Sequence, residues 1–273
     1  MTRDPTTLAQ NLADRTRGCA KSPTLPSWPD AKRGTPNSFL RGSLFAAIQG
    51  KDRRYLLREL LACQGGISIR FTGIALDQSD LDVFQGAVQL AKGSPLGDVC
   101  SFGAREFLRS LERGEGKSDL EWLKDSLSRL AATAIDFEDA KLSNVKGLLS
   151  FEHDKITGSY SLWINQDLIR FYRHGWTAVD WVIRQKLRRK PLALWLHGWL
   201  SSNATNYPTK VGTIRALSGS TNKQAAGFKR QVCAALEDLV AVGFLNDFSV
   251  EGDLVSVSRE PSPSQSRRRT VDK

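Results

Sequence analysis

The sequence has few of the residues and segments that mark secreted, zinc-binding or membrane-spanning proteins. Its four cysteines lie at positions 19, 63, 100 and 233, and no two of them have C-x-x-C spacing. Such dispersion argues against a disulfide framework and against a zinc site. No run approaches the about 18 apolar residues of a membrane span, and the N-terminus lacks the apolar segment of a secretory signal. We therefore expect a soluble, cytoplasmic protein that has no contact with a membrane.

Residue types that carry catalysis are scarce or poorly placed. The three histidines, His153, His174 and His197, are far apart and lack the spacing of metal ligands. Residues 114–118 read Gly-Glu-Gly-Lys-Ser and resemble the end of a phosphate loop, but Leu111 stands where the motif requires glycine. No carboxylates are paired for acid–base chemistry, and no His-hydrophobe-His pair accompanies a tyrosine nucleophile. We predict no enzyme, no cofactor and no metal; a nucleotide-hydrolysing or DNA-nicking enzyme is the least favoured alternative.

Positive charge is in excess. The 273 residues include 39 Lys and Arg against 29 Asp and Glu, a net charge of +10. Residues 166–273 hold 17 of the cations and 9 of the anions, so this part carries +8 of the total. A basic excess favours an anionic partner, with nucleic acid ahead of a membrane surface. Because 40% of the residues are hydrophobic, the chain can also bury a real core.

Both ends of the chain have the composition of tails. Residues 1–40 are rich in Thr, Ser and Pro, and the prolines at 23, 26, 29 and 36 leave no room for a helix. Residues 259–273 contain Pro-Ser-Pro-Ser-Gln-Ser followed by three arginines, for which a solvated tail is the simplest interpretation. We predict a flexible tail over residues 1–40 and a disordered basic tail over residues 259–273.

Between the tails, the spacing of apolar residues predicts alternating helices and strands. Ile67, Ile69 and Phe71 alternate with polar residues and predict a strand. Thr221 or Asn222 is predicted to cap the last helix, and Gly243 to end it. The predicted helices cover residues 81–91, 119–133, 191–199, 210–217 and 222–242, and the predicted β-hairpins join 147–151 to 160–163 and 244–250 to 254–258.

An internal repeat relates the two halves of the chain. Each half has a long helix with a core triad, and corresponding members of the two triads are 109 positions apart. The triads are Leu123, Leu127 and Leu130 in the first half and Val232, Leu236 and Leu239 in the second. A short helix, a turn, a longer helix and then a β-hairpin is the order of a winged helix-turn-helix. The sequence therefore predicts an α+β fold with two tandem winged-helix domains, at residues 41–165 and 166–258.

The second long helix carries side chains that suit a DNA groove. Lys223, Gly227, Arg230 and Ala234 lie opposite its core stripe. Small residues let a helix approach the groove, cations meet phosphates or guanine, and glutamine pairs with adenine. An ordinary solvated helix face is the open alternative. The residues predicted to read bases are Lys223, Gln224, Lys229, Arg230 and Gln231, and those predicted to contact phosphate beside the helix are Ser220 and Thr221.

The first long helix offers fewer such residues. Residues 1–165 contain 22 cations against 20 anions, so this half is nearly neutral. Lys117, Lys124 and Arg129 lie on or near the helix and suit contacts with phosphates better than the reading of bases. We predict that residues 41–165 contact the DNA backbone.

Short motifs occur in order along residues 28–258: Trp28-Pro29-Asp30, Ser43-Leu44-Phe45, Phe71-Thr72-Gly73, Leu127-Ser128-Arg129-Leu130, Ala132-Thr133-Ala134, Tyr207-Pro208, Gly219-Ser220 and Lys229-Arg230-Gln231-Val232. Together they resemble the TrfA-type plasmid replication initiators, with a fainter likeness to the RepC-type initiators in the second half. The resemblance implies a bacterial, plasmid-associated protein with two winged-helix domains. Such proteins bind repeated iterons in double-stranded origin DNA, help to open adjacent AT-rich DNA, and recruit a host initiator and the replicative helicase.

The same resemblance implies an equilibrium between a monomer that binds DNA and a dimer that limits copy number. We expect the dimer surface in the first domain, around the 67–71 strand and the 81–91 helix. Residues 21–27 depart from the family's namesake, because they lack its glutamine- and leucine-rich clamp-binding pentapeptide. Recruitment of the polymerase clamp by this route is therefore not expected. A winged-helix repressor of its own promoter is the alternative function.

Overall fold

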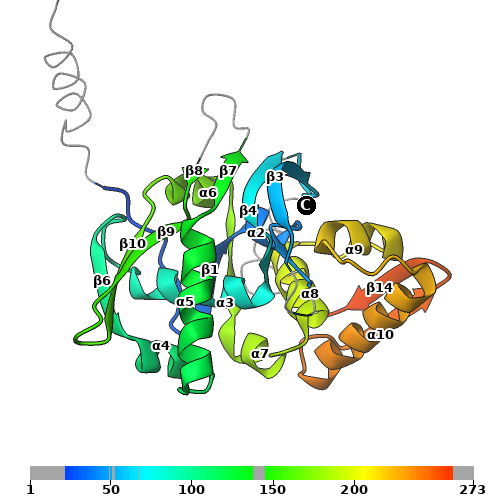
Figure 1. Cartoon of the computed structure of the whole chain (residues 1–273). Helices are drawn as coiled ribbons and strands as arrows, with labels where there is room; N and C mark the ends of the chain where they lie inside the picture. Colours follow the sequence, from blue (N-terminus) through cyan, green and yellow to red (C-terminus); the bar gives the residue numbers. More distant parts are fainter. Residues whose placement is uncertain (1–21, 49, 51–52, 67, 138–144, 261–273) are drawn as a thin grey trace, which may run out of the picture.

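The computed structural model describes residues 22–260 apart from 49, 51–52, 67 and 138–144, and it has a mixed α/β architecture with several small sheets (Figure 1). Two hydrophobic cores divide the described chain. The first draws its buried residues from between Leu25 and Trp181, and the second from between Leu187 and Val255 together with Ala47. The first half therefore extends beyond the predicted boundary at residue 165.

The second half consists of six elements in the order helix, strand, helix, helix, strand, strand. β14 lies between β12 and β13 in an antiparallel sheet, and α10 packs on α8 and α9. The predicted helices at 191–199 and 210–217 and the predicted last hairpin are confirmed. The elements are α8 (Pro191–Ser202), β12 (Thr209–Lys210), α9 (Val211–Ser218), α10 (Ala225–Ala241), β13 (Asp247–Glu251) and β14 (Leu254–Ser258).

The first half contains the same six elements in the same order. β10 lies between β6 and β9, as β14 lies between β12 and β13. The six residues of the two leucine and valine triads are all 0% exposed, so the repeat in the sequence corresponds to a repeat in the structure. The elements are α3 (Gln78–Leu90), β6 (Val99–Gly103), α4 (Ala104–Ser110), α5 (Lys117–Ala131), β9 (Leu149–His153) and β10 (Ser159–Ile164).

The first half also has strands outside this repeat. β7 and β8 lie between α5 and β9 and complete a sheet of order β3-β4-β7-β8. β2 pairs in parallel with β5. The predicted strand at Ile69 and Phe71 is confirmed as β4, and Ile67 lies outside the described residues. The strands are β2 (Phe45–Ala46), β3 (Tyr55–Leu61), β4 (Ile69–Ile74), β5 (Leu76–Asp77), β7 (Ala134–Phe137) and β8 (Val145–Lys146).

The chain is folded from residue 22 onward, which corrects the predicted flexible tail over residues 1–40. β1 (Lys32–Pro36) pairs with β11 (Trp176–Asp180), and α2 (Asn37–Leu40) follows directly. Trp28 is 3% exposed and stacks on Tyr172 of α6 (Leu168–Arg173). Proline is tolerated here because the segment is extended at a sheet edge rather than helical. The part of the predicted tail before residue 22 lies outside the described residues.

The start of α10 also differs from the prediction. The helix begins at Ala225 rather than after Thr221 or Asn222, and no side chain caps it. Asn222 is engaged otherwise, because its amide donates to Gln231 Oε1 at 3.1 Å and its Oδ1 accepts from the Gln224 backbone N–H at 3.0 Å. Its side chain therefore stabilises the turn before α10 and does not cap the helix.

A buried arginine joins the two halves. Arg184 of α7 (Trp181–Lys186) is 1% exposed and donates to Asp82 Oδ1 at 2.5 Å and to the Gln78 carbonyl oxygen at 3.0 Å. From α8, the Trp195 indole donates to the Gly42 carbonyl oxygen at 3.0 Å. These bonds reach from the start of the second half into α3 and the N-terminal segment, so the halves are held in one arrangement.

Candidate nucleic-acid interface

α10 has a buried stripe and an opposite exposed face. The stripe consists of Phe228, Val232, Ala235, Leu236 and Leu239, each 5% exposed or less. The residues predicted to read bases lie together on the other side and in the turn before the helix. Of these, Lys223, Gln224, Arg230 and Gln231 are exposed, whereas Lys229 is half-buried.

Small side chains surround Arg230. A shallow hollow on the outer face of α10 is lined by Ala226, Lys229, Arg230, Cys233, Ala234 and Glu237. Because alanine leaves the helix backbone accessible, a nucleic-acid groove can approach this face closely. Glu237 was not among the predicted residues, and its carboxylate repels phosphate. The N-terminal half of α10 is therefore the part suited to DNA.

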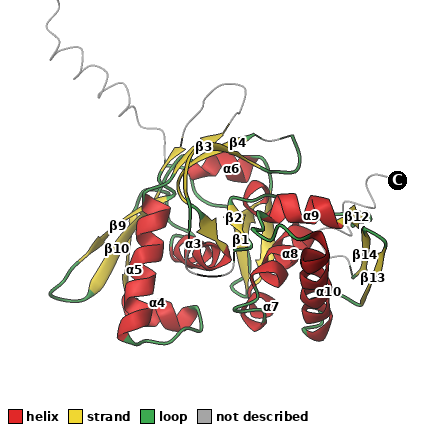
Figure 2. Ribbon diagram, turned by 45° about the vertical axis from the view of Figure 1, so that its right-hand side comes forward, coloured by secondary structure: helices red, strands yellow, loops and turns green. Residues whose placement is uncertain are grey.

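Lys229 connects α10 to the neighbouring hairpin. Its ammonium donates to the Gly252 carbonyl oxygen at 2.6 Å, in the turn between β13 and β14. Figure 2 shows this hairpin beside α10. Lys229 thus lies at the junction of α10 and the β13–β14 hairpin, and not at the centre of the exposed face of α10.

The turn before α10 is fixed against the first half. Gly219 has φ +62°, and a Cβ there would lie 2.8 Å from the Ala46 Cβ and 2.9 Å from the Ser43 Cβ. Glycine is required for both reasons, the left-handed backbone and the close approach. Beyond it, Ser220 Oγ accepts from the Asn222 backbone N–H at 3.3 Å, and Thr221 is exposed.

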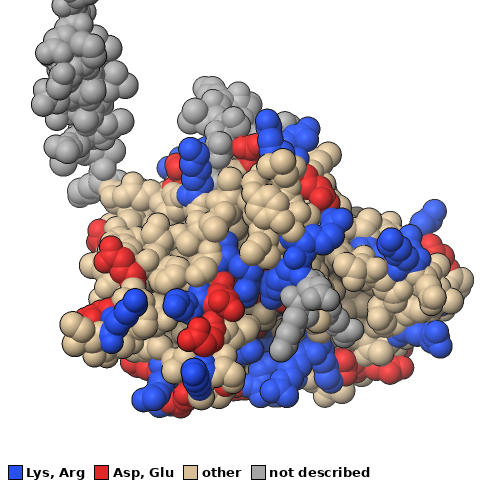
Figure 3. All heavy atoms as spheres, in the orientation of Figure 1, with Lys and Arg blue, Asp and Glu red and all other residues tan. Residues whose placement is uncertain are grey.

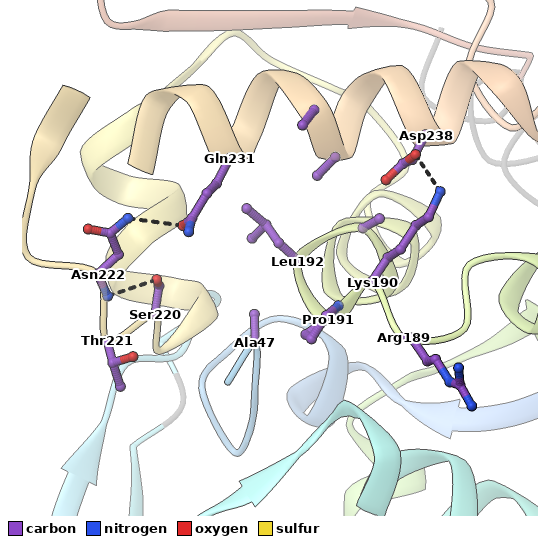
Figure 4. A pocket seen from close by; sticks show the side chains of 13 residues that line it. Ala47, Arg189, Lys190, Pro191, Leu192, Ser220, Thr221, Asn222, Gln231 and Asp238 are labelled. Carbon is purple, nitrogen blue, oxygen red and sulfur yellow. Dashed lines mark hydrogen bonds and ion pairs between the residues drawn. The ribbon is translucent and has the colours of Figure 1, made fainter. Parts of the chain in front are cut away.

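An open pocket lies between this turn, α10 and the beginning of α8 (Figure 4). Its wall on the α10 side includes Gln231 and Asp238, and Lys190 donates to Asp238 Oδ1 at 2.6 Å. The pocket brings three residues of the predicted DNA site, Ser220, Thr221 and Gln231, close to two cations. These cations, Arg189 and Lys190, were not among the predicted contacts. The polar residues lining it are Ser220, Thr221, Asn222, Gln231, Asp238, Arg189 and Lys190.

The predicted contacts of the first half lie on a different helix, α5. Lys117 and Lys124 are exposed, but Glu121 and Asp125 are exposed on the same helix. Mixed charge of this kind weakens attraction to phosphate. The Gly-Glu-Gly-Lys-Ser segment leads from α4 into α5, so it follows a helix, whereas a phosphate loop follows a strand.

Arg129 has a different role from the one predicted. Its guanidinium donates to Asp80 Oδ1 at 2.9 Å, and its side chain is 14% exposed. Asp80 is 0% exposed and also accepts from Ser126 and from Arg53. A buried carboxylate needs such partners because water no longer solvates its charge. Arg129 therefore holds α5 to α3 and is withdrawn from the candidate DNA surface.

Positive charge gathers on the face that contains α5 and α10. Figure 3 shows Lys and Arg side chains in the middle of this face, between the two helices. None of the helices in the described part of the chain is long and apolar enough to cross a membrane. The described residues also contain no cluster of three or more His, Cys, Asp or Glu side chains placed to bind a metal ion.

An exposed basic helix beside a β-hairpin is the arrangement found in proteins that bind duplex DNA. The family profile of the TrfA protein matches residues 22–259, so the chain belongs to the TrfA family and the predicted resemblance is confirmed. The chain is 26% identical over 245 residues to the plasmid replication initiator protein TrfA of Escherichia coli. That match covers 86% of this chain, which spans 64% of the length of the relative.

The fold is similar to a solved structure. Domains 2 and 3 of RctB match with a TM-score of 0.54 and 11% sequence identity, covering 82% of this chain and 98% of that one. A second RctB structure of domains 2 and 3 matches with a TM-score of 0.48, 10% identity and the same coverage.

Proposed function

We propose that this protein initiates replication of a bacterial plasmid by binding repeated sequences in double-stranded DNA at the plasmid origin. The observation that carries the proposal is the exposed basic surface of α10 beside the β13–β14 hairpin, in a chain of the TrfA family. The net charge of +10, concentrated in the second half, supports a polyanionic partner.

We propose further that the two halves are tandem winged-helix domains. In each half, three helices pack beside a three-stranded antiparallel sheet whose last strand lies in the middle. The two cores support a first domain that ends near residue 181 and a second that begins near residue 187. The β7–β8 pair is then an insertion in the first domain between its longest helix and its hairpin.

In this proposal α10 enters the major groove and the β13–β14 hairpin lies beside it as the wing. Arg230 and Gln231 have the donors and acceptors that distinguish guanine and adenine. Lys223 and Gln224 extend the same surface, and Lys229 faces the junction with the wing. Ser220 and Thr221 donate to phosphate, and Lys117 and Lys124 of the first domain contact the backbone further along the duplex.

The later steps of initiation are proposed only because the chain belongs to the TrfA family. They are the opening of AT-rich DNA and the recruitment of a host initiator and the replicative helicase, in the bacterial cytoplasm. No surface is assigned to these partners.

A dimer of the chain is proposed through β3. The expected surface around α3 is wrong, because Leu81, Phe84 and Val88 are buried, and β4 lies inside its sheet. Within the described sheet, β3 is an edge strand, and Leu57 and Leu60 on it are 73% and 57% exposed. An exposed apolar edge of this kind pairs readily with another strand.

The test of initiation is genetic. The gene and the origin region of its own replicon are joined to a resistance marker without another origin and introduced into a host. Stable transformants that are lost when Arg230→Ala replaces the wild type support an initiator. If no replicon persists but the protein represses its own promoter, the chain is a winged-helix repressor instead.

A further inference from the structure

The turn between α7 and α8 carries a dense run of cations outside the surface described so far. Residues 186–190 read Lys-Leu-Arg-Arg-Lys, and Leu187 is 0% exposed, which anchors the turn in the second core. Arg188 and Arg189 are exposed. Lys190 is paired with Asp238, whereas within the described part of the chain Arg188 and Arg189 have no ion-pair partner.

Arg189 has a backbone conformation that is unusual for its side chain. Its φ is +66°, in the left-handed region that glycine adopts freely and other residues adopt at a cost. The side chain therefore sits at a position where glycine would be the more stable choice. Strain of this kind concentrates at sites that bind ligands.

Arg189 lies at the edge of the pocket beside α10. Figure 4 shows it on the side opposite Ser220 and Thr221. The pocket has a volume of about 210 Å³, several times the roughly 30 Å³ that one water occupies, so a phosphodiester with its hydration fits. Two hydroxyls thus line one side of the pocket, and Arg189 lies at its rim on the other side, with its guanidinium directed outward.

The two flanks of α10 point to different neighbours. Lys229 faces the hairpin, whereas Gln231 and Asp238 face the pocket with Arg189. Lys229 and Gln231 are two residues apart, which is about 200° around a helix. The hairpin and the α7–α8 turn therefore border α10 on opposite sides.

A third arginine from the first half joins this region. Burial lowers the pKa of Arg113, and the nearby Arg188 and Arg189 lower it further, against the opposing effect of Asp119 and Asp82. Close by, Gln185 of α7 donates to the Ser110 carbonyl oxygen at 3.3 Å. Cations of both halves thus meet at the α7–α8 turn. Figure 3 shows Lys and Arg in the lower middle of the face, where Figure 1 places α7.

We infer that Arg188 and Arg189 bind the phosphate backbone of duplex DNA on the flank of α10 opposite the wing, and so bridge the DNA contacts of the two halves. The inference rests on the proposed DNA-binding function, to which it adds a second, sequence-independent contact. The α7–α8 turn is anchored by Leu187 and comes soon after buried Arg184, so the backbone that carries the two exposed arginines is held in place before DNA arrives.

The test compares full-length wild type with Arg188→Ala/Arg189→Gly on two labelled duplexes, one from the replicon's own origin and one of scrambled sequence. Each phosphate contact contributes about 0.9 to the salt slope, so the double variant loses about 1.8. Its deficit in affinity then shrinks about 12-fold between 50 and 200 mM salt. The preference for the origin stays unchanged, because phosphate carries no sequence information.

Two single variants separate binding from folding. Arg189→Gly removes the side chain and relieves the left-handed backbone, so its Tm is expected to equal or exceed that of the wild type while its DNA affinity falls. Arg173→Ala is the control for loss of a surface cation, because Arg173 is exposed at the end of α6, which lies away from the α7–α8 turn (Figure 1). It is expected to keep the full salt slope.

The outcomes distinguish this inference from the proposed function. If Arg230→Ala weakens origin binding but the double variant keeps the wild-type slope and affinity, the inference is overturned and the proposed function stands. If neither variant changes binding to either duplex, the α10 surface itself is not the DNA site, and the inference fails with it.

Discussion

Arg129 and Arg230 occupy similar places in the sequence but different places in the structure. Arg129 lies two positions after Leu127, and Arg230 lies two positions before Val232, so each is close to a member of a core triad on a long helix. The two arginines differ in what packs against them. Arg129 meets Asp80, which is 0% exposed and 49 positions away, whereas Arg230 is exposed. Nothing local in the sequence marks Asp80 as buried, so the role of Arg129 was not predictable.

The first prediction concerns this buried carboxylate. Asp80→Asn removes the charge that Arg129 faces, and breaking a buried pair from one side leaves the other charge unpaired. We expect the free energy of unfolding to fall by about 3–5 kcal/mol, measured by urea denaturation. Asp125→Asn, an exposed change on α5, the helix that carries Arg129, is the control and should cost little. A loss below about 1 kcal/mol for Asp80→Asn would show that the pair contributes no net stability.

The second prediction concerns His197, which is 0% exposed and whose ring nitrogens have no hydrogen-bond partner among the described residues. Burial lowers the pKa of His197 to about 3, and the charges of Arg184 and Arg259 act in the same direction. The unfolded chain binds this proton near pH 6.5, so the stability that neutral His197 contributes is present above that pH and is lost as the pH falls toward 3.

Between pH 7 and pH 5 this linkage removes about 2 kcal/mol from the free energy of unfolding. His197→Leu should lack that part of the pH dependence, whereas His174→Gln, an exposed change, should retain it. Equal pH profiles for His197→Leu and the wild type would contradict the assignment.

The third prediction separates reading from positioning. Arg230→Ala should cost about 1–3 kcal/mol in origin affinity and relax specificity, because its exposed guanidinium on α10 is proposed to read base edges. Lys124→Ala should weaken binding to all sequences alike and flatten the salt slope by about one unit. Binding isotherms on origin and scrambled duplexes at two salt concentrations measure both. A uniform loss for Arg230→Ala would make it a phosphate contact instead.

At the scale of elements, the local pattern of apolar residues predicted most of the helices and hairpins. The periodicity of apolar residues located α3, α5, α8 and the β9–β10 hairpin, because each buries one stripe or face. It missed β1 and α2, whose burial depends on β11, a partner far along the chain. It also placed the start of α10 too early, because Asn222 bonds to Gln231 rather than to the first turn of the helix.

The fourth prediction belongs to an element, the edge strand β3. Leu57→Lys/Leu60→Lys places two charges on the strand that is proposed to pair with a second copy. Sedimentation over a wide concentration range should show dimer for the wild type and monomer for the variant. Tyr207→Lys, an equally exposed apolar site in the second half, is the control and should leave the dimer intact. A variant that dimerises like the wild type would place the interface elsewhere.

At the scale of the whole molecule, the two halves share one order of elements and are joined by several buried contacts. The triads 109 positions apart revealed the repeat in the sequence. The joint was not predictable, because Arg184 bonds to Asp82 and Gln78, which lie 102 and 106 positions away. The candidate DNA surface was predicted in part. Its residues on α10 were named from the sequence, whereas the place of Arg189 beside α10 depends on the pocket that tertiary structure forms.

The most direct test of the account is the binding of the full-length protein to a labelled fragment of its own replicon's origin, against a scrambled duplex at two salt concentrations. The account predicts a preference of about 10³ or more for the origin and a stepwise ladder of complexes as successive repeats fill. Equal, salt-sensitive binding to both duplexes would contradict it and leave a basic protein that coats DNA without reading its sequence.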